Sequence, residues 1–296
     1  MISTGLYAQK RYDTEYGIIT GVSNYLGEIG GRQKEGRPFI VDLKLAKTRW
    51  NEGVYYKYRF HPMFAAKISL NYLRIEGDDK LSSNPGRKFR NLSFRNDIYD
   101  AEATLQWLFY SKDKPTGLYA RTSIYFAAYL FTGVGGYYSN PKAKYQGSYV
   151  ALRPLRTEGV AYSAYGVCVP FGAGFYVTIN RRLRAHRIGF EFNWRYTASD
   201  RLDDISSDKW GNPAELPSAT AVALNNRNPE ITSGQPDGFA ANYGWRDDGN
   251  GNNLNKAPRG NPNNKDSYIS VNLSYGIVLK ARYSKSRGKK IRSVSF

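Results

Sequence analysis

The sequence contains a single cysteine and no long apolar run. Because Cys168 has no partner among the 296 residues, a disulfide framework and a cysteine-based metal site are both excluded. No stretch of about 18 consecutive apolar residues occurs, which excludes a membrane-spanning helix. The mean hydropathy is low, at −0.58. A strand that meets lipid with only every second residue keeps such a low average, so a membrane protein built from strands is not excluded.

Acidic residues are scarce relative to basic ones. The chain has 25 Asp and Glu against 43 Lys and Arg, which gives a formal net charge of +18. The basic residues are scattered and form no recognisable RNA- or DNA-binding motif, so we expect no nucleic-acid partner. The charge is compatible with a solvated basic surface, with contact to anionic lipid head groups, or with an acidic protein partner.

Residues that commonly carry catalysis or hold metals are also few. The two histidines, His61 and His186, show no spacing typical of a metal site or a catalytic triad. The string G-V-G-G at 133–136 ends a strand and precedes a loop, which excludes a phosphate-binding turn. We therefore expect no enzyme and no cofactor. The acidic pairs at 78–79 and 203–204, with Asp208 nearby, predict either a Ca²⁺-binding loop or a solvated loop face, and we favour the solvated face.

Aromatic residues, in contrast, are abundant, with 25 Tyr, 14 Phe and 5 Trp. In I-G-F-E-F-N-W-R-Y at 188–196, large apolar side chains alternate with small, polar or charged ones. Successive side chains of an extended chain point to opposite faces, so this segment predicts a strand with one apolar and one polar face. The same alternation recurs, and it predicts eight strands at residues 16–25, 53–60, 64–75, 98–110, 118–133, 167–179, 188–196 and 268–279.

This pattern predicts an all-β fold, an eight-stranded antiparallel transmembrane β-barrel of the outer membrane. The connections at 61–62, 111–116 and 180–184 are short, whereas the other four are long. Short periplasmic turns and long extracellular loops are typical of outer-membrane barrels, and an even strand number places both termini on the periplasmic side.

The inner face of the predicted barrel carries charges of both signs. An eight-stranded barrel is just wide enough to be filled by its own side chains, and buried charges need partners. We therefore expect a closed lumen in which the basic residues pair mainly with Glu102 and Glu191. The predicted lumen charge network consists of Lys57, Arg59, Lys67, Glu102, Arg121, Glu191 and Arg195.

The barrel is expected to occupy residues 10–279, with a long polar loop at 197–265 and a basic C-terminal tail at 280–296. Residues 1–9 resemble the end of a secretory signal peptide, with Ala8 at a suitable cleavage point. The charged start and the full apolar core of such a peptide are missing, so an ordinary N-terminal segment is the alternative.

The predicted periplasmic side of the barrel is basic. Such a face could steer an acidic protein partner toward the inner mouth of the barrel, or it could meet anionic head groups of the inner leaflet. The predicted partner face consists of Lys112, Lys114, Arg181, Arg182, Arg184, Arg187, Lys289, Lys290 and Arg292.

Seven strings of residues together resemble the PorG-like outer-membrane proteins of Bacteroidota, a component of the type IX secretion system. They are N-Y-L-G-E-I-G-G (24–31), Y-K-Y-R-F-H-P-M-F-A-A-K (56–67), R-N-L-S-F-R-N-D-I (90–98), G-V-G-G-Y-Y-S-N-P-K-A (133–143), L-R-P-L-R-T-E-G (152–159), V-P-F-G-A-G-F (169–175) and Y-T-A-S-D-R-L-D-D-I-S (196–206). No single string is diagnostic, but their order and spacing are specific. The long polar loop and the basic tail are where this chain departs from the family.

The resemblance implies a non-enzymatic role. PorG-like barrels are associated with a periplasmic ring formed by a lipoprotein and its partner protein, and they serve secretion and gliding as anchors or alignment parts. Two alternatives stay open. A small pore or a solute- or lipid-binding barrel would need a lumen free of paired charges, and a lipid-modifying enzyme would need a cluster of His, Ser or Asp at the extracellular rim.

Overall fold

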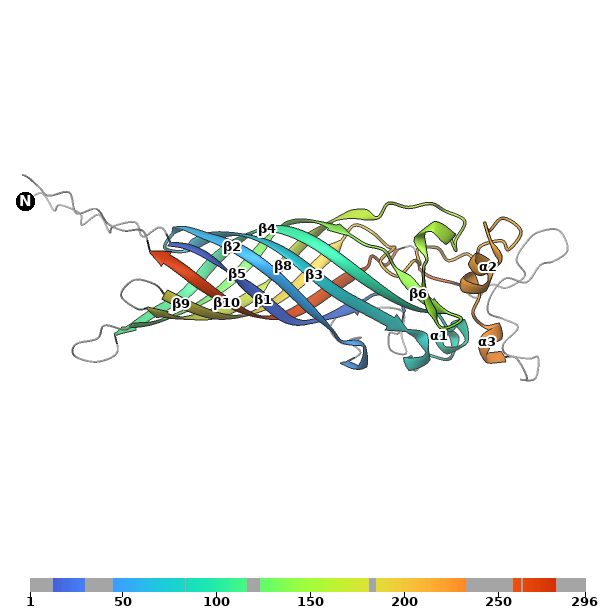
Figure 1. Ribbon diagram of the computed structural model, residues 1–296, viewed down its shortest axis with the longest axis horizontal. Helices are drawn as coiled ribbons and strands as arrows, with labels where there is room; N and C mark the ends of the chain where they lie inside the picture. Colours follow the sequence, from blue (N-terminus) through green and yellow to red (C-terminus); the bar gives the residue numbers. More distant parts are fainter. Residues whose placement is uncertain are drawn as a thin grey trace, which may run out of the picture.

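The computed structural model describes residues 13–29, 45–82, 84–115, 123–180, 185–232, 258–261 and 263–280. Eight long strands within these residues close into an antiparallel barrel, because β3 pairs with β2 on one side and with β4 on the other (Figure 1). The barrel strands are β1 (Asp13–Leu26), β2 (Arg49–His61), β3 (Phe64–Asp78), β4 (Ser93–Pro115), β5 (Ser123–Tyr138), β8 (Tyr165–Asn180), β9 (Ala185–Thr197) and β10 (Ser267–Lys280).

The alternation of side chains sets the two faces of the wall. One row of paired residues across four strands runs through Val22, Val271, Phe192 and Ala173, and all of them face outward. The adjacent row includes Asn272 and Glu191, which are buried and face inward. Within the described residues, all eight strands keep the inward and outward phases that the sequence predicts, and the fold class is confirmed. Residues 118–122 of the predicted fifth strand lie outside the described residues.

The outer surface carries two belts of aromatic residues. The belt nearer the long loops, here called the upper belt, consists of Trp50, Tyr72, Tyr99, Tyr138 and Tyr165, one from each of five neighbouring strands of the barrel. Its neighbouring ring centroids lie 5.1 to 6.4 Å apart. In the lower belt they lie 5.5 to 6.0 Å apart along Tyr110, Phe126, Phe175 and Phe190. On β8 the two belts are ten residues apart. At about 3.3 Å per residue and a tilt of about 40°, this separation corresponds to roughly 25 Å along the barrel axis, the height of a bilayer's apolar band.

Short elements gather at the end of the barrel that carries the long loops (Figure 1). They are η2 (Leu45–Lys47), η3 (Asp79–Leu81), α1 (Pro85–Arg90), β6 (Lys142–Tyr145), β7 (Ser148–Ala151), η4 (Arg153–Leu155), α2 (Ala219–Asn225) and α3 (Pro229–Thr232). The sequence analysis did not predict the β6–β7 hairpin. Its two-residue turn has Gln146 and Gly147 at positive φ angles of 47° and 86°, the geometry of a tight hairpin turn that favours glycine.

Within the described ranges, no helix has both the length and the apolarity that a membrane crossing requires.

Candidate functional site

The lumen is crossed by ion pairs, and the first is centred on Glu15 near the short-turn end. Its carboxylate lies 3.2 Å from the Lys57 ammonium and also accepts a hydrogen bond from Arg187. The Tyr55 hydroxyl donates to the same carboxylate at 2.5 Å. All four side chains are buried, so the charges offset one another away from water.

A second ion pair lies across the lumen between β3 and β9. The Lys67 ammonium donates to both oxygens of Glu191 at 2.7 Å, and the Tyr129 hydroxyl donates to the same carboxylate at 2.8 Å. Lys67 and Glu191 are 124 residues apart in the sequence, so this contact joins opposite parts of the wall.

The third ion cluster is centred on Arg195 of β9. Its guanidinium lies 2.9 Å from Asp100 and also binds Glu102, and it donates to the Ser270 hydroxyl at 2.8 Å. The amide of Asn193 donates to Glu102 at 3.1 Å. Arg195 is 1% exposed, and its two carboxylate partners are equally buried. Removal of the arginine would leave two carboxylates without a counter-charge.

Little open space remains between the first two ion clusters. The cavity among Glu15, Lys57, Lys67, Arg187 and Glu191 has a volume of about 20 Å³, which is room for about one water molecule. Aromatic side chains fill the rest of this level, and the ring of Tyr176 lies 4.4 Å from the Lys57 ammonium and 4.0 Å from the Arg187 guanidinium. Cation–π contacts of this kind hold the charges in place.

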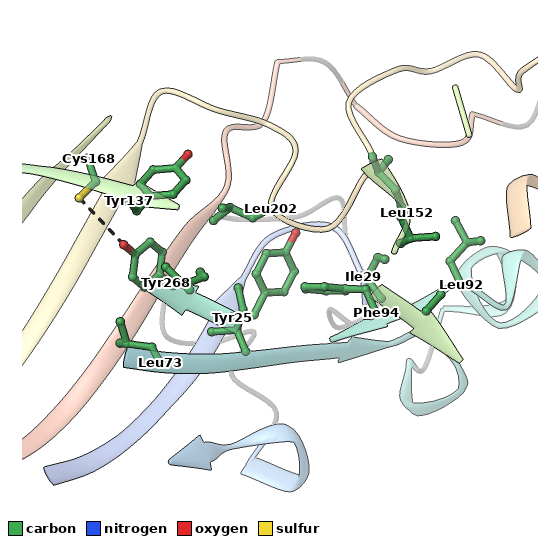
Figure 2. Close-up of a cluster of buried hydrophobic side chains, with 14 of the residues drawn as sticks. Tyr25, Ile29, Leu73, Leu92, Phe94, Tyr137, Leu152, Cys168, Leu202 and Tyr268 are labelled. Atoms are coloured by element: carbon green, nitrogen blue, oxygen red, sulfur yellow. Dashed lines mark hydrogen bonds between the residues drawn. The ribbon is translucent and has the colours of Figure 1, made fainter. Parts of the chain in front are cut away.

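The mouth of the barrel on the long-loop side is closed by a hydrophobic core. Leu73, Ile75 and Ile98 point inward from the wall and are fully buried. Loop residues belong to the same buried cluster, among them Ile29, Leu152 and Leu202, which Figure 2 labels. We call this assembly of long loops and apolar wall residues the cap. Cys168 lies at its base, 3% exposed, beside the Tyr268 hydroxyl, which agrees with an inert inward position.

Two buried arginines tie the four long loops of the cap together. Arg90 holds Asp79 through two hydrogen bonds at 2.7 and 2.9 Å and donates to the carbonyl groups of Glu28 and Arg259. Arg259 in turn binds Glu158 at 2.5 Å. Because these bonds connect all four loops, the described part of the cap is held as one unit.

The carboxyl groups of Glu28, Asp200, Asp203 and Asp266 lie close together in the cap, and two of them contact the Tyr25 hydroxyl. This oxygen lies 2.7 Å from Asp203 and 2.6 Å from Asp266. One hydroxyl has one proton, so it donates to one carboxylate, and the other carboxyl must donate a proton of its own. Burial, reinforced by neighbouring carboxylates, raises the pKa of Asp200 and of Asp203 to about 7, and burial also raises the pKa of Glu28 to about 7. The cap therefore retains protons at mildly acidic pH.

Asp79, Asp203 and Asp204 correct the interpretation of the acidic pairs as a solvated loop face, whereas Asp208 is exposed, as that interpretation predicts. Asp79, Asp203 and Asp204 are at most 2% exposed, because they bind arginine, tyrosine and threonine side chains inside the cap. Within the described ranges, no group of three or more His, Cys, Asp or Glu side chains has a metal-binding arrangement.

The structure places the predicted lumen residues as follows. Lys67 contacts Glu191 and Arg195 contacts Glu102, whereas Lys57 pairs with Glu15, a residue that the sequence analysis did not select. Arg59 lies at the short-turn end, where it donates to the carbonyl groups of its own turn rather than to an acid. Arg121 falls outside the described residues. The pattern of alternation carried a signal for Glu15, since it shares the inward phase with Gly17.

One member of the predicted partner face is corrected. Arg187 is 4% exposed and binds Glu15 inside the lumen, because it precedes the outward-facing Ile188 by one position. Lys112 is exposed on β4. The side chains of Lys114, Arg181, Arg182, Arg184, Lys289, Lys290 and Arg292 lie outside the described residues.

The two histidines belong to different strands and face away from the lumen core. The Nδ1 atom of His61 accepts a hydrogen bond from the Met63 amide at the end of β2. His186 of β9 stacks on Tyr275, with 2.7 Å between its Nδ1 atom and the tyrosine hydroxyl. Each histidine is thus engaged within its own strand end or with a neighbouring aromatic ring.

Comparison with known proteins gives one family and several distant structures. The model of a domain of unknown function, DUF6089, matches residues 2–215. The Neisserial surface protein A has 8% identity and a TM-score of 0.33, and the match covers 92% of this chain and 97% of that chain. Ail, the attachment invasion locus protein of Yersinia pestis, has 8% identity and a TM-score of 0.29, with 91% and 99% covered. No curated protein matches the sequence.

Proposed function

We propose, from the premise that this chain belongs to the DUF6089 family, that it is a non-enzymatic outer-membrane barrel that anchors or aligns a periplasmic ring complex of the type IX secretion and gliding machinery. The observation that carries the proposal is the filled lumen beneath a closed cap. A barrel without a passage acts through its surfaces, and an apolar band between two aromatic belts fits it to a bilayer.

The assignment to the type IX secretion system rests on the seven sequence strings that, in their order along the chain, resemble PorG-like proteins. The ring lipoprotein and its partner protein are the partners that this resemblance implies. In outer-membrane barrels the short turns face the periplasm, so the ring would meet the end of the barrel that carries Lys112. The alternative of a small pore or binding barrel is disfavoured by the buried ion pairs at Glu15, Glu191 and Arg195.

The filled lumen predicts that the purified protein does not conduct ions. We expect no stable current steps after reconstitution into planar bilayers, because the lumen at the level of Glu15 and Glu191 has only about 20 Å³ of open space, too little for a hydrated ion to pass. A porin in the same bilayers serves as the positive control. Reproducible steps from the pure barrel would favour the pore alternative.

The proposed docking is tested by a crosslinking pull-down from outer membranes. We expect a variant that lacks the residues after Tyr283 and has a neutralised N-R-R-L-R turn at 180–184 to insert but to lose the ring proteins, with lower secretion. The matched control changes exposed lysines at the opposite end, Lys88→Gln and Lys209→Gln. Unchanged co-purification and secretion at physiological salt would exclude the basic face as the docking site.

A further inference from the structure

Basic side chains line the outside of the barrel immediately beyond the upper aromatic belt. Arg74 follows Tyr72 by two positions on β3, and Arg95 precedes Tyr99 by four positions on β4. Lys142 of β6 is paired with Arg95 in the sheet. Residues an even number of positions apart share a face, so these cations lie on the same outward side as the belt. We call Arg74, Arg95 and Lys142 the basic collar.

The carboxylate of Asp97 lies at the centre of the basic collar. One Asp97 oxygen accepts hydrogen bonds from Arg74 at 2.7 Å and from the Tyr72 hydroxyl at 2.8 Å. The other oxygen lies 3.8 Å from Arg95 and 3.7 Å from Lys142. Three cations around this carboxylate leave a net two positive charges, because Glu76, the sheet partner of Arg95, is itself paired with Arg49 at 2.6 Å.

The cations are held in place and remain accessible. Arg95 lies 3.9 Å above the Tyr149 ring, and Arg74 lies 5.8 Å from the Trp50 ring. The side chains of Arg74, Arg95 and Lys142 are 25%, 21% and 31% exposed. Fixed guanidinium groups that are partly exposed fit the oxygens of a phosphate group.

The position of the basic collar selects the source of that phosphate. Aromatic belts lie at the level of the lipid head groups, and two to four residues of a strand tilted by about 40° add only about 5–10 Å along the barrel axis. The cations therefore stand in the head-group layer, on the lipid-facing side of the wall. A site for a soluble anion or a protein partner would have no reason to begin at the aromatic belt.

We propose that the basic collar binds a phosphate group carried by a lipid head group in the leaflet next to the long loops. The proposal rests on the membrane location given under the proposed function. It adds a specific lipid contact on the outer wall, at the opposite end from the proposed docking face.

The test compares two forms of one glycolipid. The full chain is placed in phosphatidylcholine nanodiscs that contain either phosphorylated lipid A or lipid A stripped of its phosphates, and the glycolipid retained by the protein is measured by native mass spectrometry. We expect a clear preference for the phosphorylated form. Each cation near a membrane surface contributes about fivefold in binding, so Arg74→Gln, Arg95→Gln and Lys142→Gln together should weaken retention by on the order of a hundredfold.

The Asp97→Asn variant distinguishes lipid binding by the basic collar from a purely structural role of the collar. It removes the central negative charge, so lipid A should be retained at least as well as by the unchanged protein. If the basic collar served only to hold the strands together, loss of the Asp97 ion pairs would disrupt it, and the variant would retain less lipid A than the unchanged protein. Lys88→Gln and Lys209→Gln are the controls, because these exposed lysines stand away from the belt, and they should have no effect.

Co-flotation with phosphatidylcholine vesicles reports membrane insertion independently. A protein that floats but shows no preference for phosphorylated lipid A overturns the collar proposal alone. A protein that does not float overturns the membrane location and the collar with it. Inorganic phosphate that displaces lipid A at comparable concentration would also overturn the lipid as the ligand, because the site would then take a free anion.

Discussion

Replacing Arg195 with methionine is expected to cost about 3–5 kcal/mol of folding free energy. The substitution leaves Asp100 and Glu102 buried without a counter-charge in the lumen. The measurement is a urea titration of the protein folded in phosphatidylcholine vesicles, followed by the gel mobility of the folded form.

The compensated variant distinguishes lost charge from lost packing. Arg195→Met combined with Asp100→Asn and Glu102→Gln removes all three charges, and most of the lost stability should return. Arg201→Met is the matched control, because Arg201 is partly exposed beside Glu158 and its loss should cost less than about 1 kcal/mol. A triple variant no more stable than the single one would contradict a role of the charges.

The cap is expected to be more stable at mildly acidic pH than at alkaline pH. Asp200 is 6% exposed, neither of its oxygens has a hydrogen-bond partner among the described residues, and its pKa is raised to about 7 by burial. An acid with a raised pKa binds more protons in the folded protein than in the unfolded chain. Its stabilising contribution is complete below the unfolded value, near 4, and is lost as the pH rises through about 7.

For Asp200 alone, the cap should lose about 2 kcal/mol between pH ~5.5 and pH ~8. The measurement is hydrogen exchange of the cap amides in the folded barrel at the two pH values. Asp200→Asn should stabilise the cap at the higher pH and flatten the dependence. Asp208→Asn is the control, since this residue lies in the same loop outside the cluster of four carboxyl groups. An Asp200→Asn cap with the full pH dependence would contradict the assignment.

Strands could be predicted from the sequence because alternation is a local property. Ile188 to Tyr196 fixes its own inward and outward phases without reference to any other segment, and β9 keeps these phases in the barrel. The β6–β7 hairpin escaped prediction because K-A-K-Y and S-Y-V-A are only four residues each, too short for a period to be seen. The exact ends of the strands could not be predicted for a related reason. β4 continues to Ser93 through charged outward residues that interrupt the apolar pattern.

The partners inside the lumen could not be predicted because they depend on how far each strand is shifted against its neighbours. Lys57 was expected to meet Glu102 or Glu191, but the register places it directly beside Glu15. Arg187 was assigned to the periplasmic partner face because the apolar pattern began at the next residue. Had the strand been extended by one residue, the same alternation would have turned Arg187 inward.

The cap was missed for a different physical reason. Its loops are rich in Asn, Gly and Asp, and such composition predicts irregular, solvated chain. Single apolar residues such as Leu202 and Ile205 nevertheless find a core, because the barrel mouth already presents Leu73 and Ile98. A core assembled from isolated residues of several loops has no local signature.

The seam between β1 and β10 also sets the order in which the molecule can form. Its fourteen paired positions run from Asp13 with Lys280 to Leu26 with Ser267, so the first and last strands of the wall are direct neighbours. The hydrogen bond from Tyr25 to Asp266 likewise joins residues 241 positions apart. Contacts between such distant residues form slowly, and they require both strands to be present. Until β10 arrives, the edges of β1 and β9 are unpaired and open to association with other chains. Closure is therefore a late event in folding, and a chain that stops before β10 keeps both edges exposed.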